Sequence, residues 1–373
     1  MVKARGVKIQ DVAREAGVSV STVSRVVRGH SDVSDETRER VQAVVGRLGY
    51  RPSPLARALV SGRSQLLALL VSDITNPWYP ELARSIEVHA GRAGYGLVIC
   101  NTDDDPQITR RHVQRLLDHG IEGIVHASVG LDALEVSPEA VGDTPVVFVN
   151  RRPAAAGASY VVTDNVAGGR LLAAHLIALG HTTIGFVSGP AYAATGQERL
   201  RGVQEIVAER RGQVGILVEQ GESSKASGAA AVRTWLERST LPTAIIGSND
   251  TIALGAMEAL VEAGLHVPED VAVAGFDDIS SSSSSLISLT CIRQQTEKMG
   301  EHAVTALLRL MRAGLRTRRR PIREVLRAEL VIRASTVGRT RLAQDVHKAE
   351  AMQSDSSAPV AGDRVVGRLR VST

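Results

Sequence analysis

Residues 8–28 carry the feature that most constrains this chain, which is a pair of short helical patterns separated by a break at Gly17. Apolar residues recur at helical spacing on both sides of the break, so each segment should bury one stripe. The predicted buried positions are Ile9, Val12, Ala13, Ala16, Val20, Val23, Val26 and Val27. Gly17 can adopt the left-handed conformation that ends a helix, and Ser19 can cap the amides that begin the next one. The pattern is typical of a helix-turn-helix.

The second helix of such a pair enters the major groove of DNA, with residues near its N-terminus facing bases and phosphates. The residues at these positions are Val20, Ser21, Thr22, Ser24 and Arg25. Arg25 could donate two hydrogen bonds to a guanine, which is worth about 1–3 kcal/mol of discrimination, whereas Val20 could read only shape or a thymine methyl group. The alternative is a helical hairpin within another kind of domain, but the cap, the glycine break and the hydroxyl groups agree better with DNA binding.

Positive charge is concentrated on the same part of the chain. Residues 1–63 hold 12 Lys and Arg against 6 Asp and Glu, a net charge of +6, and the remainder holds 32 against 34, a net charge of −2. Contact with phosphates requires such a basic segment, and the remainder has an ordinary globular balance.

A third helix is expected to close the head. Ser34, followed three residues later by Thr37 with acidic residues between them, marks its start, and Gly49 ends it. The residues that would face inward are Val41, Val44, Val45 and Leu48.

The next segment, residues 51–63, holds two prolines and then LARALV, which is just over one helical turn. So short a helix is marginal alone in water and needs a partner, either DNA or its twin in a dimer. A simple tether between domains is an equally open interpretation.

From Gln65 onward, short apolar runs alternate with helical patterns. The first series is LLALLVSD, YGLVICNT, GIEGIVHAS and PVVFVNRR, and the second is TIGFVSG, VGILVEQG, TAIIGSND and VAVAGFDD. Runs of this type predict parallel sheets flanked by helices, and two successive series predict two α/β lobes.

Polar residues follow these runs, at the ends of the strands where open parallel sheets bind ligands. A hydroxyl-rich ligand needs planar side chains that form two hydrogen bonds at once, together with an aromatic face. Trp78 and Tyr79 could provide the aromatic face. The side chains that form two hydrogen bonds at once could be Asn150, Arg199, Asn249 and Asp277. Each residue taken alone could instead cap a helix, and we prefer that interpretation for Asp103–Asp105, Asp164 and Asp250.

The sequence resembles the lactose-repressor and galactose-repressor (LacI/GalR) family of bacterial transcriptional regulators. The resemblance rests on DVAREAGVSVSTVSRVV, VSDETRERV, LGYRPSPLARAL and several later motifs, and it covers about residues 8–337. It implies a two-lobe core like that of periplasmic binding proteins, preceded by a hinge helix that pairs with its twin in the minor groove. There Leu59 would wedge between bases, flanked by Ala56 and Arg57.

The resemblance also implies that Trp78, Tyr79, Arg199, Asn249 and Asp277 contact an effector. Asn150 stands where many members have aspartate. Three further departures, Ser223, Thr296 and Ser284, replace large or aromatic residues, so we expect less aromatic cover from the second lobe and more hydroxyl lining. The specificity of known members should therefore not be transferred.

The expected fold class is an all-α three-helix helix-turn-helix head with a hinge helix, followed by a two-lobe α/β core with parallel sheets. The expected parts are a head at 1–50, a hinge at 51–63, a core at 64–337 and a disordered tail at 338–373. Lobe 1 would hold about 64–162 and 294–323, and lobe 2 about 163–293 and 324–337. The tail lacks the repeating leucines of the lactose repressor's tetramerising tail, which favours a dimer.

We expect a transcriptional regulator, a repressor, that binds a palindromic double-stranded DNA operator as a homodimer. A small effector, a sugar or sugar derivative bound between the lobes, would control it. A ligand-independent regulator with a vestigial pocket stays open as the alternative.

Other classes of protein fit less well. A periplasmic sugar-binding protein would need a signal peptide in place of the head, and an enzyme would need a nucleophile elbow, a P-loop or clustered histidines. Cys100 and Cys291 lack the spacing of metal ligands, so we expect buried, unpaired thiols, no metal and no cofactor. No run reaches the ~18 apolar residues of a membrane helix, so we expect a cytoplasmic protein without membrane partners.

Overall fold

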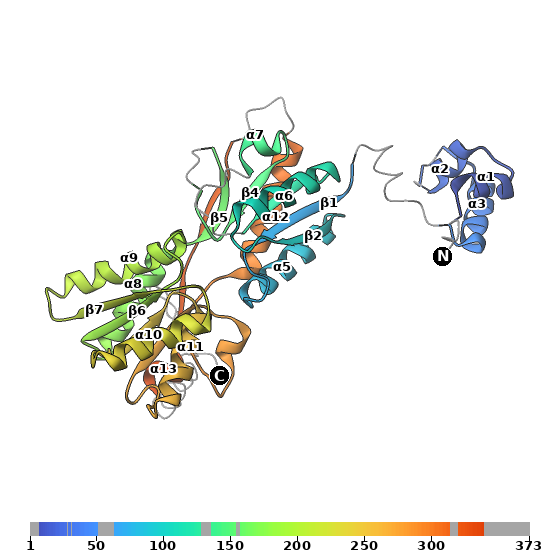
Figure 1. The fold of residues 1–373 in the computed structure, drawn as a ribbon. Helices are drawn as coiled ribbons and strands as arrows, with labels where there is room; N and C mark the ends of the chain where they lie inside the picture. The colour runs from blue at the N-terminus through green and yellow to red at the C-terminus, as the bar shows by residue number, and fades with distance from the viewer. Residues whose placement is uncertain are drawn as a thin grey trace, which may run out of the picture. The chain divides into compact units, whose positions relative to one another are not determined.

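A computed structural model describes residues 7–27, 29–30, 32–50, 63–127, 136–153, 157–313 and 320–338. The chain divides into two compact units, residues Met1–Gln65 and Leu66–Thr373 (Figure 1). The proposed hinge positions at 51–62 and the tail from residue 339 lie outside the described residues.

The first unit is a three-helix head. Its helices are α1 (Ile9–Ala16), α2 (Val20–Val27) and α3 (Asp35–Leu48). Gly17 and Gly49 end α1 and α3 in the left-handed conformation, with φ of 64° and 63°, as their positions predicted. The head encloses a small core around Val12, Val23 and Val41. Ser34 occupies the N-cap position of α3, but its hydroxyl donates to the hydroxyl of Thr37 at 2.9 Å and does not cap the amides.

The second unit contains two six-stranded sheets, each with helices on both faces (Figure 1). The first sheet has the strand order β11-β5-β4-β3-β1-β2. Its strands are β1 (Leu66–Val71), β2 (Gly96–Asn101), β3 (Gly123–His126), β4 (Val146–Val149), β5 (Ser159–Thr163) and β11 (Arg323–Leu326). The helices of this lobe are α5 (Trp78–Arg92), α6 (Pro106–Asp118), α7 (Pro138–Val141) and α12 (Thr296–Arg312).

The second sheet has the strand order β12-β10-β9-β8-β6-β7. Its strands are β6 (Thr183–Ser188), β7 (Gly215–Gln220), β8 (Ala244–Gly247), β9 (Ala272–Asp277), β10 (Thr290–Arg293) and β12 (Glu329–Val331). Its helices are α8 (Asn165–Ala178), α9 (Ala194–Glu209), α10 (Lys225–Glu237), α11 (Asp250–Glu262), the 3₁₀ turn η2 (Ser280–Ser283) and α13 (Ala334–Val337).

Burial explains why the strands are apolar runs. Leu67, Leu69 and Val71 of β1 face the core that α5 and α12 cover, whereas Ala68 and Leu70 face the core under α6 and α7. A strand covered on both faces has no polar side, so the apolar sequence is continuous.

Two glycines let α8 and α9 pack closely in the second lobe. A Cβ atom on Gly169 or on Gly202 would lie only 2.1 Å from a backbone carbonyl oxygen of the other helix. This contact fixes α9, which carries Arg199, against the start of α8.

The prediction of two lobes with parallel sheets is confirmed. One strand pair, β10 with β12, is antiparallel. The segment VLRAELVIRAST, which resembles a single final strand, forms two short strands in different sheets. Since β11 pairs with β5 in the first lobe, the third crossing between lobes comes after Leu326, a few residues later than the expected boundary at 323.

Three segments therefore cross between the lobes. They are Thr163–Asn165, from the last residue of β5 to the first of α8, then Gln294–Gln295 between β10 and α12, and Arg327–Ala328 between β11 and β12. Both cysteines are free, Cys291 buried and Cys100 half-buried. No helix in the described ranges is long and apolar enough to cross a membrane.

Candidate DNA interface and ligand cleft

The exposed face of α2 carries the predicted DNA-contacting residues. Val20 is 42% exposed, so its place in the predicted buried stripe is wrong, because the first residue of the helix projects beyond the core. The Ser19 hydroxyl accepts a hydrogen bond from the Thr22 amide at 3.1 Å and thus caps α2 as predicted. It also shares hydrogen bonds with the hydroxyls of Ser21 (2.7 Å) and Thr22 (2.8 Å). These hydroxyls lie together at the N-terminus of the helix.

Arg25 completes this surface one turn further along α2. Its guanidinium lies 3.5 Å from the Asp32 carboxylate, and both side chains are more than half exposed. An exposed ion pair contributes only about 0–1 kcal/mol, so a phosphate or a guanine could replace Asp32 at little cost. Ser24 is half-buried on the same helix. Ala56, Arg57 and Leu59 lie outside the described residues.

In the first lobe, two local hydrogen-bonded turns bring Trp78 and Tyr79 to the start of α5. Asp73 accepts from the Thr75 amide at 2.9 Å, and Asn76 accepts from the Trp78 amide at 3.1 Å. The two rings meet edge to face, 5.0 Å apart. They are only 2% and 5% exposed, so little of either ring is open to solvent in this structure.

The Tyr79 hydroxyl remains a neutral donor and acceptor. Burial raises the pKa of Tyr79, and the carboxylates of Asp104, Asp277 and Asp73 raise it further. The Ser280 amide of the second lobe donates to Glu81 of α5 at 3.0 Å, so the start of α5 lies at the boundary between the lobes.

In the second lobe, Arg199 is the most constrained candidate. Its Nε donates to Asn165 Oδ1 at 2.9 Å and its Nη1 donates to the Ser248 carbonyl at 2.6 Å. The guanidinium also lies 3.6 Å from the Asp277 carboxylate. Burial lowers the pKa of Arg199, and the nearby carboxylates oppose this, so the guanidinium stays charged. Its remaining N–H groups keep the geometry of a fork that can bind two oxygens.

Asp277 and Asp278 end β9 with unusual backbone angles, φ of 133° and 62°. This turn sends neighbouring carboxylates in different directions. Asp277 accepts from Gln294 Nε2 at 2.7 Å, whereas Asp278 accepts from Arg293 and Arg333, both at 2.6 Å. Such angles in residues other than glycine cost about 1–3 kcal/mol and are typical of functional sites.

Asn150 follows β4 with φ of 71°, a second left-handed residue at a strand end. Its side chain is buried, and its Oδ1 has no hydrogen-bond partner within the described residues. The structure does not connect it to Arg199 or Asp277 through any hydrogen bond among those residues.

The helix cap of α11 differs from the prediction, because Asn249 and not Asp250 forms it. Asn249 caps α11, because its Oδ1 accepts from the Ile252 amide at 2.8 Å, which leaves its Nδ2 and one lone pair of Oδ1 for a ligand. Asp250, which we expected to cap, instead accepts from the Ile279 amide at 3.0 Å and the Ser282 hydroxyl at 2.7 Å. These two hydrogen bonds attach η2 to the start of α11. Asp105 and Asp164 do cap α6 and α8 as predicted.

Burial raises the pKa of both acidic residues near this site. The pKa of Asp250 rises to about 7, helped by the neighbouring Asp277 carboxylate. The pKa of Asp277 rises to about 6, although Arg199 and the hydrogen bond from Gln294 oppose the rise.

Sequence reasoning missed several residues of the site. Asn165 and Gln294 hold Arg199 and Asp277, and Ser72 donates to Asp104 at 2.5 Å. Tyr192, in the segment after β6, lies close enough to Asp104 and Glu222 for both carboxylates, together with burial, to raise its pKa. The only sequence signal for these residues was their position just after strands.

The departures that we noted lie around the same region. Thr296 begins α12 and is half-buried, whereas Ser223 and Ser284 are exposed. None of the three supplies an aromatic ring, and the aromatic ring that contacts Arg199 in the second lobe is that of Phe276.

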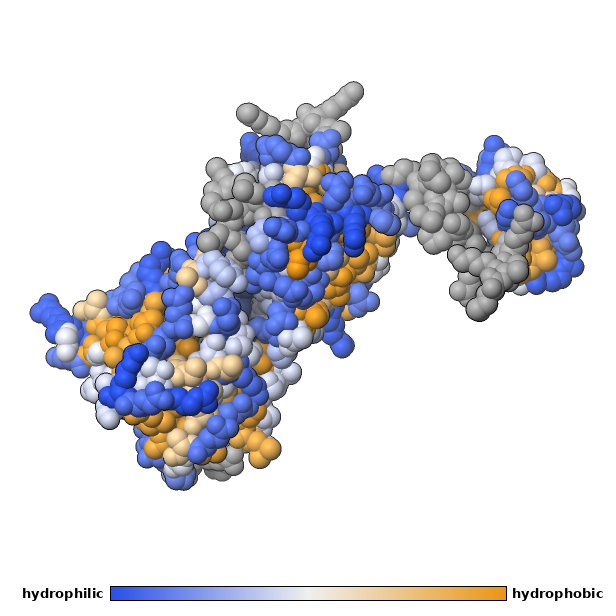
Figure 2. Space-filling view, in the orientation of Figure 1, coloured by the Kyte–Doolittle hydropathy of each residue, from blue (hydrophilic) through white to orange (hydrophobic). Residues whose placement is uncertain are grey.

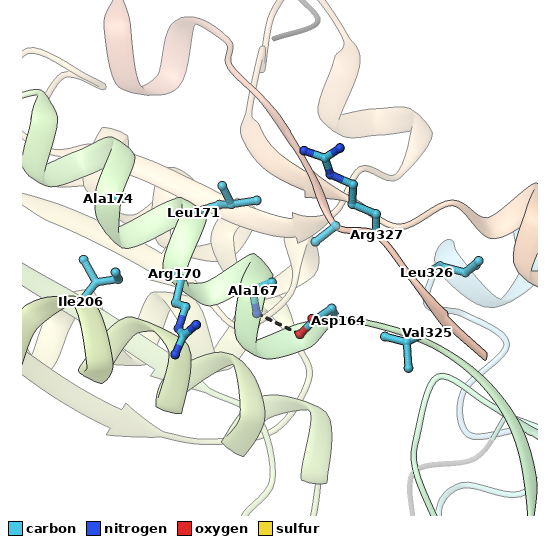
Figure 3. Close-up of a pocket in the computed structure, with 10 residues that line it drawn as sticks. Asp164, Ala167, Arg170, Leu171, Ala174, Ile206, Val325, Leu326 and Arg327 are labelled. Carbon is cyan, nitrogen blue, oxygen red and sulfur yellow. Dashed lines mark hydrogen bonds between the residues drawn. The ribbon is translucent and has the colours of Figure 1, made fainter. Parts of the chain in front are cut away.

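A separate cavity of about 610 Å³ lies beside the lobe crossings (Figure 3). It is lined by α8, by Ile206 of α9 and by residues 325–328, and none of the predicted effector residues faces it. Figure 3 shows the side chains of Arg170 and Arg327 extending in different directions from its rim, with Asp164 hydrogen-bonded to Ala167 between them. The cavity is therefore distinct from the candidate ligand site.

A helix-turn-helix head joined to a two-lobed α/β core defines a class of protein, the DNA-binding transcriptional regulators whose core resembles a ligand-binding domain. Two family models match this chain, "Bacterial regulatory proteins, lacI family" over residues 8–53 and "Periplasmic binding protein-like domain" over residues 173–336.

Curated proteins and solved structures agree. The HTH-type transcriptional regulator DegA of Bacillus subtilis (strain 168) is 34% identical over 333 residues, 88% of this chain and 97% of DegA. The ribose operon repressor of Escherichia coli (strain K12) is 33% identical over 306 residues, 80% of this chain and 92% of that protein. A crystal structure of the Lac repressor dimer bound to operator and the anti-inducer ONPF has a TM-score of 0.79 and 30% identity, covering 89% of this chain and 99% of that one. The chain belongs to the lacI family of bacterial regulatory proteins.

Proposed function

We propose that this protein is a homodimeric repressor whose binding to a palindromic operator is controlled by a small effector in the cleft between the lobes. The observation that carries the proposal is the arrangement of Arg199, a buried guanidinium held by Asn165 and Ser248 and facing Asp277. A buried charge needs paired, fixed partners, and a fork fixed in this way is suited to hydroxyl-bearing ligands. The same chain carries the head, and DNA binding by the head is the activity that such a ligand would control.

Exposed apolar side chains on the core support the dimer. Leu286 is 85% exposed and Val261 of α11 is 65% exposed, and Val88 of α5 and Ile99 of β2 are exposed too. Figure 2 shows hydrophobic surface over the part of the core that carries α5 and β2. Burying such residues against a second copy is favourable. The Lac repressor, a relative by structure, is a dimer on its operator.

In such a dimer, two heads would read the half-sites through Val20, Ser21, Thr22, Ser24 and Arg25. By family resemblance we assign the residues between head and core, 51–63, to a hinge in which Leu59, flanked by Ala56 and Arg57, enters the minor groove. We keep 1–50 as the head, 64–337 as the core and 338–373 as a tail.

The charges near Arg199 and Tyr79 narrow the proposed class of effector. Arg199 is already matched by Asp277, and its other charged neighbours are Asp250 and Glu198. On the first lobe, Asp73 and Asp104 lie near Tyr79. The carboxylates outnumber the guanidinium, so they would repel a phosphorylated or carboxylated ligand. We therefore propose a neutral sugar or polyol, or one that carries an amine. The name of the ribose operon repressor agrees with a sugar.

The alternative is a regulator that needs no ligand. Two observations favour it, namely the nearly complete burial of Trp78 and Tyr79 and the use of Asn249 Oδ1 as a helix cap. Both reduce the surface that is open to a ligand in this conformation. In either case we assign the protein to the cytoplasm as a regulator without enzymatic activity, cofactor or membrane partner.

A thermal-shift screen with sugars, polyols, amino sugars, sugar acids, sugar phosphates and nucleobases tests the proposal. We expect neutral or amine-bearing sugars to raise the melting temperature, since a ligand that binds only the folded state stabilises it. Stabilisation by sugar phosphates in preference to the parent sugars would contradict the proposed class. No stabilisation by any compound would favour the ligand-independent alternative.

A further inference from the structure

A ring of side-chain contacts joins two of the three lobe crossings to the candidate effector pair. Thr163 Oγ1 donates to Gln294 Oε1 at 2.9 Å, and Gln294 Nε2 donates to Asp277 Oδ1 at 2.7 Å. Asp277 faces Arg199 at 3.6 Å, and Arg199 Nε donates to Asn165 Oδ1 at 2.9 Å. Thr163 and Asn165 are two residues apart, so the backbone closes the ring.

Every member of the ring is buried. Buried polar groups are expensive to leave without partners, so each contact restricts the positions of the others. Asn165 is held in turn, because its Nδ2 donates to Glu198 Oε2 at 2.8 Å. The ring is therefore a connected network and not a set of independent bonds.

Gln294 suits its position because a carboxamide both donates and accepts. Its oxygen receives the Thr163 hydroxyl proton, and its nitrogen donates to the Asp277 carboxylate. A glutamate there could not donate to Asp277, and an apolar residue could do neither. The residue type and the two distances fix a single orientation of the amide.

The places where the ring meets the backbone are the segments that must rotate if the lobes move. Thr163 and Asn165 belong to the first crossing and Gln294 belongs to the second. Domain closure changes backbone angles at a few such residues. The third crossing does not enter the ring, and the cavity beside residues 325–328 leaves that segment unpacked on one side (Figure 3).

We propose that Gln294, Thr163 and Asn165 are positioning residues that transmit occupation of Arg199 and Asp277 to the lobe angle. The inference rests on the proposed effector site. A ligand bound to Arg199 or Asp277 would either replace a contact of the ring or strengthen it. Either effect favours one arrangement of the first two crossings. Such a ligand shifts the lobe equilibrium only through this difference in interaction.

Thr163→Val tests the ring with the smallest change. It keeps the shape of the side chain and removes only the bond between the two crossings. Thr243→Val is the control for the substitution itself, since the exposed Thr243 hydroxyl donates to the Thr183 carbonyl at 3.1 Å within the second lobe, away from every crossing. Thr163→Ser restores the hydroxyl.

The first measurement is hydrogen exchange of the full-length, ligand-free chain. Loss of one buried hydrogen bond should speed exchange by about tenfold in peptides that contain 163–166 and 294–296. Thr163→Ser should return exchange to the wild-type rate, and Thr243→Val should leave both crossings unchanged. Faster exchange spread evenly over the second lobe would indicate a merely structural role and overturn the proposal, as would unchanged exchange at the crossings.

The second measurement is binding of each variant to a duplex selected by the wild type from random DNA. We expect Thr163→Val to change this affinity by about fivefold or more, within the usual range of allosteric coupling, although it lies far from α2 in the sequence. Equal affinities for wild type and variant would overturn the proposal. A wild type that selects no DNA would contradict the proposed function instead, and the exchange experiment would still decide on the ring.

Discussion

The Arg199 guanidinium lies over the ring of Phe276, 3.7 Å from its centroid, and Phe276 directly precedes Asp277 in β9. The ring gives the guanidinium an apolar face to rest on, and the next residue supplies the opposite charge. Gly168 of α8 leaves the space, because a Cβ atom there would lie 2.5 Å from the ring. One strand end therefore fixes both the position and the charge balance of the proposed effector-binding arginine.

Removing the ring should weaken ligand binding without removing the charge. A cation over an aromatic ring in a buried site is worth about 2 kcal/mol, so Phe276→Leu should raise the dissociation constant of a stabilising sugar by roughly tenfold or more. Isothermal titration checks this. Phe186→Leu, at another buried phenylalanine of the same lobe core, controls for packing and should leave binding within about twofold. Equal losses in both variants would contradict the role given to the ring.

Asp250 and Asp277 should contribute stability that falls as the pH rises from about 4 to 7, whereas buried His126, whose pKa is lowered, contributes in the opposite direction. Asp250 and Asp277 have pKa values raised to about 7 and about 6 in the folded chain, against about 4 when unfolded. Across this range these two groups keep protons in the folded state that they have released in the unfolded state, so their contribution is greatest at the acid end and levels off above pH 7.

Urea unfolding at a series of pH values measures this dependence, and Asp250→Asn should flatten it. The asparagine oxygen can still accept from Ile279 and Ser282, so the fold should survive. Asp118→Asn, at the exposed end of α6, serves as the control. If Asp250→Asn and the wild type lose the same stability between pH 5 and 8, the raised pKa of Asp250 is wrong.

DNA binding should weaken steeply with salt. The head carries the excess of positive charge, and each phosphate contact contributes a slope of about −0.9 to the plot of log affinity against log salt. Arg25→Ala should lower affinity for the selected duplex by about 10-fold or more. Fluorescence anisotropy measures both effects, with Arg111→Ala, exposed on α6, as the control. A flat salt response would contradict the role of the head.

The proposed wedge can be tested independently of the effector. Leu59→Ala should reduce bending of the selected duplex and its specific affinity, since intercalation offsets its own cost through wider contact. Stabilisation of the core by a sugar should be unaffected. Gel mobility of circularly permuted duplexes reports the bend, and a wild-type bend in the variant would refute the assignment of Leu59.

The two-lobed fold could be predicted because parallel strands buried on both faces leave continuous apolar runs. The runs LLALLV and AVAGFD become β1 and β9. The division into β11 and β12 could not be predicted, because both are short edge strands with polar residues. Nothing in the local sequence indicates that two consecutive strands join different sheets. The left-handed turn at Gly17 was predictable, since glycine alone adopts it without strain.

The site was harder to predict, because its contacts are long-range. Thr163 and Gln294 are 131 residues apart, and neither periodicity nor composition connects them. Asn249 and Asp250 are both good capping residues, so the choice between them depends on where α11 begins, to within one residue. The burial of Trp78 and Tyr79 depends on packing around α5 and not on their residue types.

The most direct test of the account is the affinity of the full-length protein for its selected palindrome with and without a sugar that stabilises it. We expect the sugar to change this affinity by about 5–150-fold, the usual range of allosteric coupling. Arg199→Ala should abolish the change, whereas Arg201→Ala, an exposed neighbour on α9, should respond as the wild type does. A sugar that binds the cleft but leaves operator affinity unchanged, or an Arg199→Ala variant that still responds, would contradict the central claim.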